Sequence, residues 1–196
     1  MKGAIPTLGV CVAAALLMGG ALGCSSLSVN SDWDSEEDFS RLRTYMWLPG
    51  PQPKTGDIRL DNPLLDTRLR QAIDYQFATQ GYEKIKSGQP DFRVGYHLST
   101  QKKLDVRTVN NYYGYGWGAG WGYAPMGYSD TYVDEYDMGT VILDIVDTKL
   151  NRLVWRGSAS GRLRKKSSPE ENEKDAREVA KAILERFPPK VKGGAE

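Results

Sequence analysis

The stretch of residues 139–161 constrains the fold more than any other part of the chain. It reads GTVILDIVDTKLNRLVWRGSASG, and its first half alternates so that one face of an extended strand is wholly apolar and the other nearly so. This pattern is typical of a central strand that is buried on both faces. A polar, turn-prone segment follows at 147–152, and the apolar run then resumes at Leu153-Val154-Trp155. Two strands joined by a short polar turn predict a β-hairpin.

Two helices are predicted from their starting residues and their apolar periodicity. Asn62-Pro63 and Ser168-Pro169 each place an N-capping residue before a proline in the first turn, where the missing N–H of proline costs nothing. The first helix ends at Gly81, and the second ends before two consecutive prolines. Each helix carries one apolar stripe, so each has one face to bury.

Further strands are predicted at residues 28–33, 44–48, 82–86, 92–98 and 104–109, where β-forming or alternating residues occur. Short links between consecutive strands favour antiparallel pairing, and two one-sided helices favour one face of a sheet. The predicted fold class is α+β: a single two-layer domain with a mostly antiparallel sheet and two helices packed on one face. Trp155 in the hairpin and Phe187 at the end of the second helix are expected to be buried.

The first 23 residues predict an export signal. Lys2 is followed by an apolar run from residue 4 to residue 22, and the segment ends in Gly23-Cys24. A transmembrane helix is the alternative, because about 18 apolar residues can just span a bilayer. Against it, residues 1–23 contain five glycines and one proline, and no basic cluster follows. The Gly-Cys end resembles the bacterial lipobox, in which the cysteine is acylated before cleavage, although Ala21 stands where leucine is usual.

Lipidation at Cys24 predicts both the location and the domain limits. Cys24 becomes the first residue of a mature chain that spans residues 24–196. Its thiol carries lipid and Cys11 leaves with the signal, so no disulfide is expected. Ser25 favours the outer membrane, since aspartate at that place retains enterobacterial lipoproteins in the inner membrane. We therefore expect a signal at 1–23, a tether at 24–38, a domain at 39–189 and a disordered tail at 190–196, on the periplasmic face of a Gram-negative outer membrane.

A set of short landmarks resembles, in the same order, a family of bacterial envelope lipoproteins known only as domain of unknown function number 4136. The landmarks are Phe39-Ser40-Arg41-Leu42-Arg43-Thr44-Tyr45-Met46-Trp47-Leu48-Pro49, Asn62-Pro63-Leu64, Gly81-Tyr82, Pro90-Asp91-Phe92, Gly139-Thr140, Leu153-Val154-Trp155-Arg156-Gly157 and Phe187-Pro188-Pro189. The resemblance runs from about Val29 to Pro189 and implies compartment and fold, but no catalytic residue. The hairpin turn departs from the family's Thr-Gly-Lys with Leu150-Asn151-Arg152, which keeps a residue that tolerates a left-handed backbone.

Several classes of site are not expected. The chain has 26 basic and 25 acidic residues, and loss of Lys2 with the signal brings the net charge to zero, so no field steers it to nucleic acid. The mature chain has one histidine, His97, and one cysteine, which argues against a transition-metal site or a bound cofactor. Ala159 occupies the place that a serine-hydrolase elbow gives to serine, and no phosphate-binding loop is present.

Two charged segments are interpreted first as solvated surface. Asp130, Asp134, Glu135 and Asp137 gather without the regular spacing and turn-making glycine of a calcium loop, which predicts an acidic strand edge. A weak cation site and a pair of acid–base carboxylates remain alternatives. The basic run at residues 162–166 predicts a loop, with contact to lipid headgroups or an acidic partner as its alternative.

The segment 113–123 alternates aromatic residues with glycine and alanine. In an extended chain its rings would line one face, so Tyr115, Trp117, Trp121 and Tyr123 form a candidate binding surface for sugar rings, headgroups or a partner. A flexible low-complexity loop is the alternative.

No stretch predicts catalytic residues, and the chain is expected not to be an enzyme. The predicted function is a non-enzymatic envelope interaction module, held to the membrane through lipid on Cys24 and contacting cell-wall glycan or an envelope protein. One alternative is a hydrolase of envelope glycan that uses two carboxylates. The other is a carrier of an apolar ligand, which needs a cavity between helices and sheet. The sequence does not define an oligomeric state.

Overall fold

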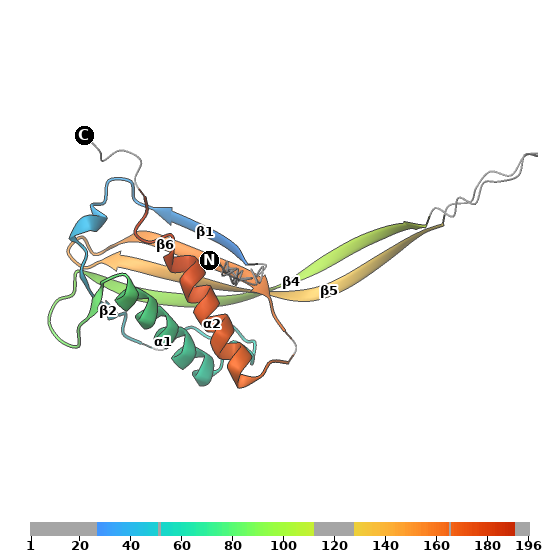
Figure 1. Cartoon of the computed structure of the whole chain (residues 1–196), viewed down its shortest axis with the longest axis horizontal. Helices are drawn as coiled ribbons and strands as arrows, with labels where there is room; N and C mark the ends of the chain where they lie inside the picture. Colours follow the sequence, from blue (N-terminus) through green and yellow to red (C-terminus); the bar gives the residue numbers. More distant parts are fainter. Residues whose placement is uncertain (1–26, 51, 112–127, 165, 191–196) are drawn as a thin grey trace, which may run out of the picture.

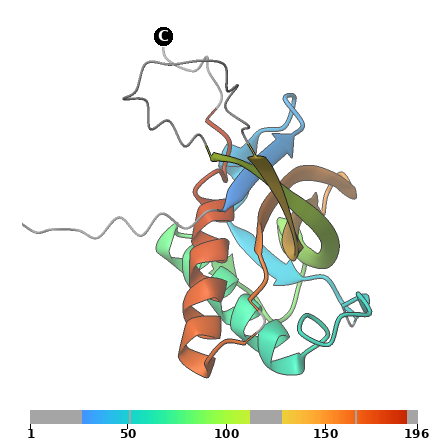
Figure 2. The ribbon, with the colours of Figure 1, turned by 90° about the vertical axis from the view of Figure 1, so that its right-hand side faces the viewer.

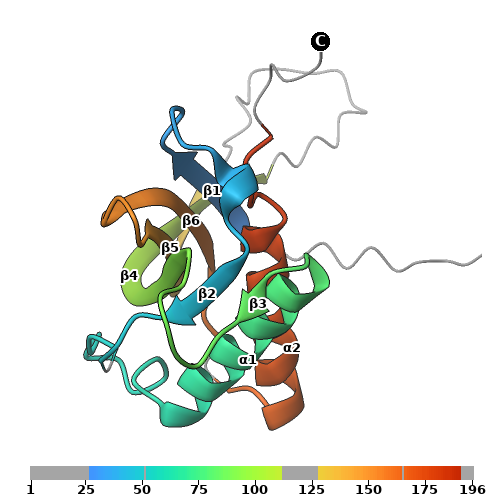
Figure 3. The same ribbon diagram turned by 90° about the vertical axis from the view of Figure 1, so that its left-hand side faces the viewer.

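The computed structural model describes residues 27–50, 52–111, 128–164 and 166–190. Its centre is a six-stranded sheet in the order β1-β6-β5-β4-β2-β3. The strands are β1 Ser28–Trp33, β2 Thr44–Trp47, β3 Glu83–Lys84, β4 Phe92–Asn111, β5 Tyr128–Asp147 and β6 Arg152–Arg162. Two helices, α1 Pro63–Thr79 and α2 Pro169–Leu184, lie on one face of the sheet (Figure 1, Figure 3). The predicted α+β fold is confirmed.

The sheet is mixed rather than purely antiparallel. β1, β6, β5 and β4 form antiparallel pairs, whereas β2 pairs in parallel with both β3 and β4. The parallel pairing follows from α1, because a helix between β2 and β3 returns the chain to the end of the sheet at which β2 began. Among the antiparallel pairs, the short-link argument applies to β5 and β6 alone, since β1 and β6 are the first and last strands described and residues 112–127 separate β4 from β5.

The hairpin predicted at residues 139–161 is formed by β5 and β6, and β5 lies between β6 and β4. Its turn holds Asn151 at φ 49°, in the left-handed region that asparagine tolerates. The expectation that both faces of β5 are buried in apolar surroundings is wrong for one face. Ile142 and Val146 are only half-buried there, and Asp144 between them pairs with Arg156. Both helices lie on the opposite face, so this one has no apolar cover from them.

Two predicted boundaries differ from the structure. Residues 28–33, which the sequence places in the tether, pair with β6 from Ser28–Ser160 to Trp33–Trp155, so the folded part begins at β1. The strands predicted at 92–98 and 104–109 form one continuous strand, β4. The polar residues between them keep their register with β5 and include neither glycine nor proline, so nothing interrupts the strand.

The core lies between the sheet and the C-terminal halves of the helices, around Phe187. Phe187 is 2% exposed, and its ring centroid lies 5.2 Å from that of Trp155, 5.4 Å from that of Tyr82 and 6.0 Å from that of Phe77. Trp155 is 0% exposed, so both residues expected to be buried are buried. Gly157 makes room for the indole, because a Cβ at this position would lie 2.2 Å from the Trp155 ring.

Asp91 joins β2 to the start of β4. Its Oδ2 accepts hydrogen bonds from the backbone N–H groups of Arg43 and Thr44, at 3.0 and 2.8 Å, and from the Thr44 hydroxyl at 2.9 Å. Burial acts to raise the pKa of Asp91, but these hydrogen bonds outweigh it and hold the pKa below its ordinary value. We expect Asp91→Ala to lower the free energy of unfolding by about 1–3 kcal/mol at neutral pH, because three partly buried or exposed donors lose a charged acceptor that joins two strands.

The effect of Asp91→Ala should depend on pH. A carboxyl whose pKa is lower in the folded state stabilises the fold above its unfolded-state pKa, near about 3.9, and loses that contribution as the pH falls through the folded-state pKa. Urea unfolding of wild type and variant at about pH 7 and about pH 3 measures this. The difference between the two proteins should shrink at the lower pH, and an equal difference at both would contradict the role given to the carboxylate.

Candidate functional site

A groove opens between the helices and the sheet at the end where both helices begin. α1 and α2 are tied at their other ends by a hydrogen bond of 2.8 Å from the Gln80 side chain to the carbonyl of Leu184. The groove has a volume of about 1400 Å³. The chain between β6 and α2 passes this end on its way from the sheet to the helices (Figure 2).

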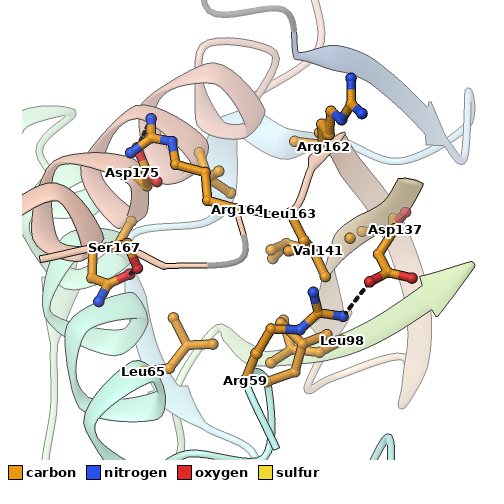
Figure 4. Close-up of a pocket in the computed structure, with 18 of the residues that line it drawn as sticks. Arg59, Leu65, Leu98, Asp137, Val141, Arg162, Leu163, Arg164, Ser167 and Asp175 are labelled. Carbon is orange, nitrogen blue, oxygen red and sulfur yellow. Dashed lines mark hydrogen bonds and ion pairs between the residues drawn. The ribbon is translucent and has the colours of Figure 1, made fainter. Parts of the chain in front are cut away.

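Apolar side chains from four elements and from the segment after β6 form part of the groove wall. The side chains are half-buried, and they are Leu65 of α1, Leu98 of β4, Val141 of β5, Val179 of α2 and Leu163 after β6. Leu65, Leu98, Val141 and Leu163 gather around one space in Figure 4. Four of them, Leu65, Leu98, Val141 and Val179, pack against the edge of the core and also border this space.

Small residues explain why the space is there. Gly139 and Gly161 are paired across β5 and β6 and line the groove together with Ala159 of β6. A Cβ at Gly139 would lie 2.5 Å from Leu163 Cδ2, and one at Gly161 would lie 2.8 Å from Leu27 Cδ2. The two glycines therefore let two leucines lie directly on the sheet at the edge of the groove.

Charged residues line the groove alongside these apolar walls, and most of them are paired. Arg59 Nη2 lies 2.8 Å from Asp137 Oδ2, drawn as a dashed line in Figure 4, and Arg164 Nη2 lies 3.2 Å from Asp175 Oδ1. Hydrogen bonds to Asp57, and then to Asp137, raise the pKa of Arg59, so its guanidinium stays charged. The groove thus combines apolar and charged side chains, which suits an amphipathic molecule.

The carboxylates that line the groove are mostly engaged with bases. Glu135 pairs with Lys102 at 2.7 Å, Asp137 with Arg59, Asp175 with Arg164, and Glu178 with Lys174 at 3.7 Å, which leaves Asp134 as the fifth. A glycosidase site needs one carboxylic acid and one carboxylate facing each other across the substrate. In the groove, by contrast, four of the five carboxylates form ion pairs with bases.

His97 lies on the opposite face of the sheet from the groove. Its Nε2 is 3.4 Å from Asp144 Oδ2, and Arg156 donates to both oxygens of Asp144 at 2.6 and 2.8 Å. These three side chains come from the neighbouring strands β4, β5 and β6, and the sequence did not predict that they would meet. Over the part of the chain that the structure describes, no three His, Cys, Asp or Glu side chains form a group that could hold a metal.

The other residues singled out in the sequence fall in three places. Arg162, Arg164 and Lys166 line the groove, as do Asp134, Glu135 and Asp137, so the basic and acidic segments share one site. Cys24 and the aromatic residues Tyr115, Trp117, Trp121 and Tyr123 lie outside the described residues, as does the side chain of Asp130 and most of the predicted tail at 190–196. Neither described helix is long and apolar enough to cross a membrane.

The groove itself was not predicted. Its apolar lining has the periodicity of ordinary core positions, so helix and strand patterns do not set it apart. The available signal was the run of small residues in β6, Gly157-Ser158-Ala159-Ser160-Gly161, whose last glycine is opposite Gly139. Such a run predicts a part of the core that few side-chain atoms fill. One of its glycines, Gly157, instead makes room for the Trp155 ring.

Comparisons with known proteins give one family and some distant structures. A family model described as Domain of unknown function (DUF4136) matches residues 29–189. No curated protein matches the chain. A solved structure of a PDZ domain protein from Parabacteroides distasonis is 14% identical with a TM-score of 0.49, and the match covers 85% of this chain and 37% of that one. The chain therefore spans little more than a third of that protein.

Two structures of the PelC dodecamer from Paraburkholderia phytofirmans, one of them of a variant, are also similar. Each is 8% identical to this chain, and the TM-scores are 0.42 for the variant and 0.44 for the other. The matches cover 81% and 84% of this chain and 94% and 99% of the PelC chains.

Proposed function

The chain belongs to the family described as Domain of unknown function (DUF4136), and on that premise we propose that this member is a lipid-anchored protein of a Gram-negative outer membrane. Its periplasmic domain acts without catalysis, as an interaction module that binds an apolar or amphipathic molecule in the groove. The proposed function combines two functions predicted from the sequence, the envelope interaction module and the carrier of an apolar ligand.

The anchoring half of the proposal is supported by the first 24 residues. An apolar export signal ends in Gly23-Cys24, and Leu27, three residues later, lines the groove. Three residues extend at most about 11 Å, so a lipid on Cys24 would hold the groove close to the membrane surface. A molecule that enters the groove would then have a short path from the bilayer.

The groove carries the binding half of the proposal. Sites for small molecules are concave, mostly apolar spaces of about 300–1,000 Å³ with a few polar groups at their edge. At about 1400 Å³ the groove is larger than this range, and it lies between helices and sheet, where a carrier needs its cavity. The paired carboxylates favour binding over hydrolysis of a glycan.

The candidate surface formed by Tyr115, Trp117, Trp121 and Tyr123 stays a prediction beside this one. Contact with cell-wall glycan or an envelope protein through these rings is compatible with a ligand in the groove, since the two would use different parts of the chain.

Filling the groove should abolish binding of an apolar probe. Val141→Trp adds a large side chain on the groove wall, and Val146→Trp makes the same change in the same strand on the opposite face, so it serves as the control. With a dansyl-labelled fatty acid, fluorescence titration should show binding to wild type and to Val146→Trp, and at least about tenfold weaker binding to Val141→Trp, equivalent to about 1.4 kcal/mol.

The thermal midpoints of wild type, Val141→Trp and Val146→Trp show whether all three proteins are folded, which the comparison of probe binding requires. If Val141→Trp keeps a cooperative unfolding transition and binds the probe as wild type does, the groove is not the binding site. If wild type does not bind the probe at all, the carrier half of the proposal fails while the anchoring half stands.

A further inference from the structure

β4 and β5 continue well beyond the sheet as a two-stranded ribbon, defined here as residues 102–111 paired with 128–137 (Figure 1). β2 pairs with β4 only as far as Val94, and β6 pairs with β5 only as far as Met138. The ribbon has ten pairs in register, from Lys102–Asp137 to Asn111–Tyr128. Among the described residues, no strand pairs with either outer edge of the ribbon.

A two-stranded ribbon of this kind lacks what stabilises a sheet in water. Two strands alone are marginal, and stability needs a third strand or a layer packed on an apolar face. One face of the ribbon carries Leu104, Val106 and Val133, which are 65%, 59% and 57% exposed. Val106 and Val133 are directly opposite in the register, so the three form one exposed patch. Within the described residues, the ribbon therefore has an open face and two open edges.

The two edges carry opposite charge. In β4, residues 102–107 contain the bases Lys102, Lys103 and Arg107 against one acid, Asp105, whereas in β5 residues 131–137 contain three acids and no base. Two ion pairs lie within the ribbon, Lys102 with Glu135 at 2.7 Å and Arg107 with Asp105 at 2.8 Å, and all of these side chains except the half-buried Asp105 are exposed. Such pairs contribute little in water and exchange partners readily.

These charges also argue against insertion of this part of the ribbon into a bilayer. Ionised side chains are costly in hydrocarbon, and bases or acids lie on both faces of residues 102–107 and 131–137. The basic edge of β4 attracts an acidic edge. A second copy of the same chain presents such an edge, that of its β5.

We infer that copies of this chain assemble through the ribbon, with the β4 edge of one copy pairing with the β5 edge of the next. The added strand is antiparallel, as β4 and β5 already are, and main-chain hydrogen bonds join the edges while the charges set the direction. The contact is heterologous, because each copy uses two different edges, so it produces a closed ring or an open filament rather than a two-fold dimer.

Charge reversal on each edge tests this inference in the full-length chain. The β4-reversed protein carries Lys102→Glu and Lys103→Glu, the β5-reversed protein carries Asp134→Lys and Glu135→Lys, and the doubly reversed protein carries all four changes. Two differently tagged copies are produced in one cell, extracted in mild detergent, and recovered through one tag. Lys86→Glu with Lys149→Glu makes the same change in charge as in the β4-reversed protein, at exposed positions outside the ribbon, and is the control for that protein.

Wild type and the control should each co-purify with themselves, whereas the β4-reversed and β5-reversed proteins should each fall to the background of an untagged chain. A mixture of the β4-reversed and β5-reversed proteins should co-purify again, as should the doubly reversed protein with itself. If the changes acted by unfolding the ribbon, mixing would not restore co-purification, because each copy would still carry like charges on its own β4 and β5. Wild-type copies that do not co-purify, or a β4-reversed protein that self-associates like wild type, would overturn the inference.

Discussion

Phe187→Ala is expected to remove most of the stability of this domain, with a loss of about 3–5 kcal/mol in the free energy of unfolding. The ring contacts five other aromatic rings, those of Phe39, Phe77, Tyr82, Phe92 and Trp155, and the Trp155 contact is the closest at 5.2 Å between centroids. Its removal leaves a cavity where the end of α2, the loop before β2 and the sheet meet.

Denaturation in urea measures the loss, since the midpoint falls with the free energy while the slope stays the same for a two-state domain. Tyr75→Ala is the control, because Tyr75 is an aromatic residue in α1 that is 67% exposed. It should cost within about 0.5 kcal/mol, as substitutions at the surface do. A loss below about 1 kcal/mol for Phe187→Ala would mean that the helix layer does not pack on the sheet as described.

Replacement of Cys24 is the second change with a large expected effect, on location rather than stability. One acyl chain holds a protein to a membrane only reversibly, whereas several together hold it firmly, at about 0.8 kcal/mol for each buried CH₂. Cys24→Ser removes every chain, so the protein should move from the membrane fraction to the soluble fraction. The variant should be made behind the signal of a secreted protein, so that cleavage does not depend on the cysteine.

Cys11→Ser, made with the chain's own residues 1–23, is the control for the loss of a cysteine as such. Cys11 lies inside the segment that the proposal assigns to the signal, so its replacement should leave the protein in the membrane fraction. Fractionation after a high-salt wash, read by immunoblot, separates the outcomes. A Cys24→Ser protein that still sediments with membranes after the wash would contradict lipid anchoring at this residue.

Local signals in the sequence predict the elements of the fold well. Asn62 and Ser168 cap the helices as expected, and Ser168 forms a full capping box with Glu171. Asn151 closes the hairpin in the left-handed conformation that its residue type allows. These features depend on neighbours within a few residues, so single-sequence reasoning reaches them.

Features that depend on distant segments were missed. The parallel pairing of β2 with β4 joins residues 44–47 to residues 92–94 through a helix, and the length of β4 depends on β5 holding its register across a polar stretch. The groove needs α1, α2 and three strands in place before its lining can be recognised. Apolar side chains that line a groove have the same local periodicity as those that pack in the core, so periodicity does not distinguish the two.

The proposed binding of an apolar or amphipathic molecule in the groove between helices and sheet can be mapped on the protein itself. The most direct measurement is photolabelling of the membrane-bound full-length chain with a diazirine-bearing fatty acid, followed by peptide mapping. The label should attach to peptides that contain Leu65, Leu98, Val141 or Val179, and Val141→Trp should remove it. Label that maps to the opposite face of the sheet around His97, or that is unchanged in Val141→Trp, would contradict the claim.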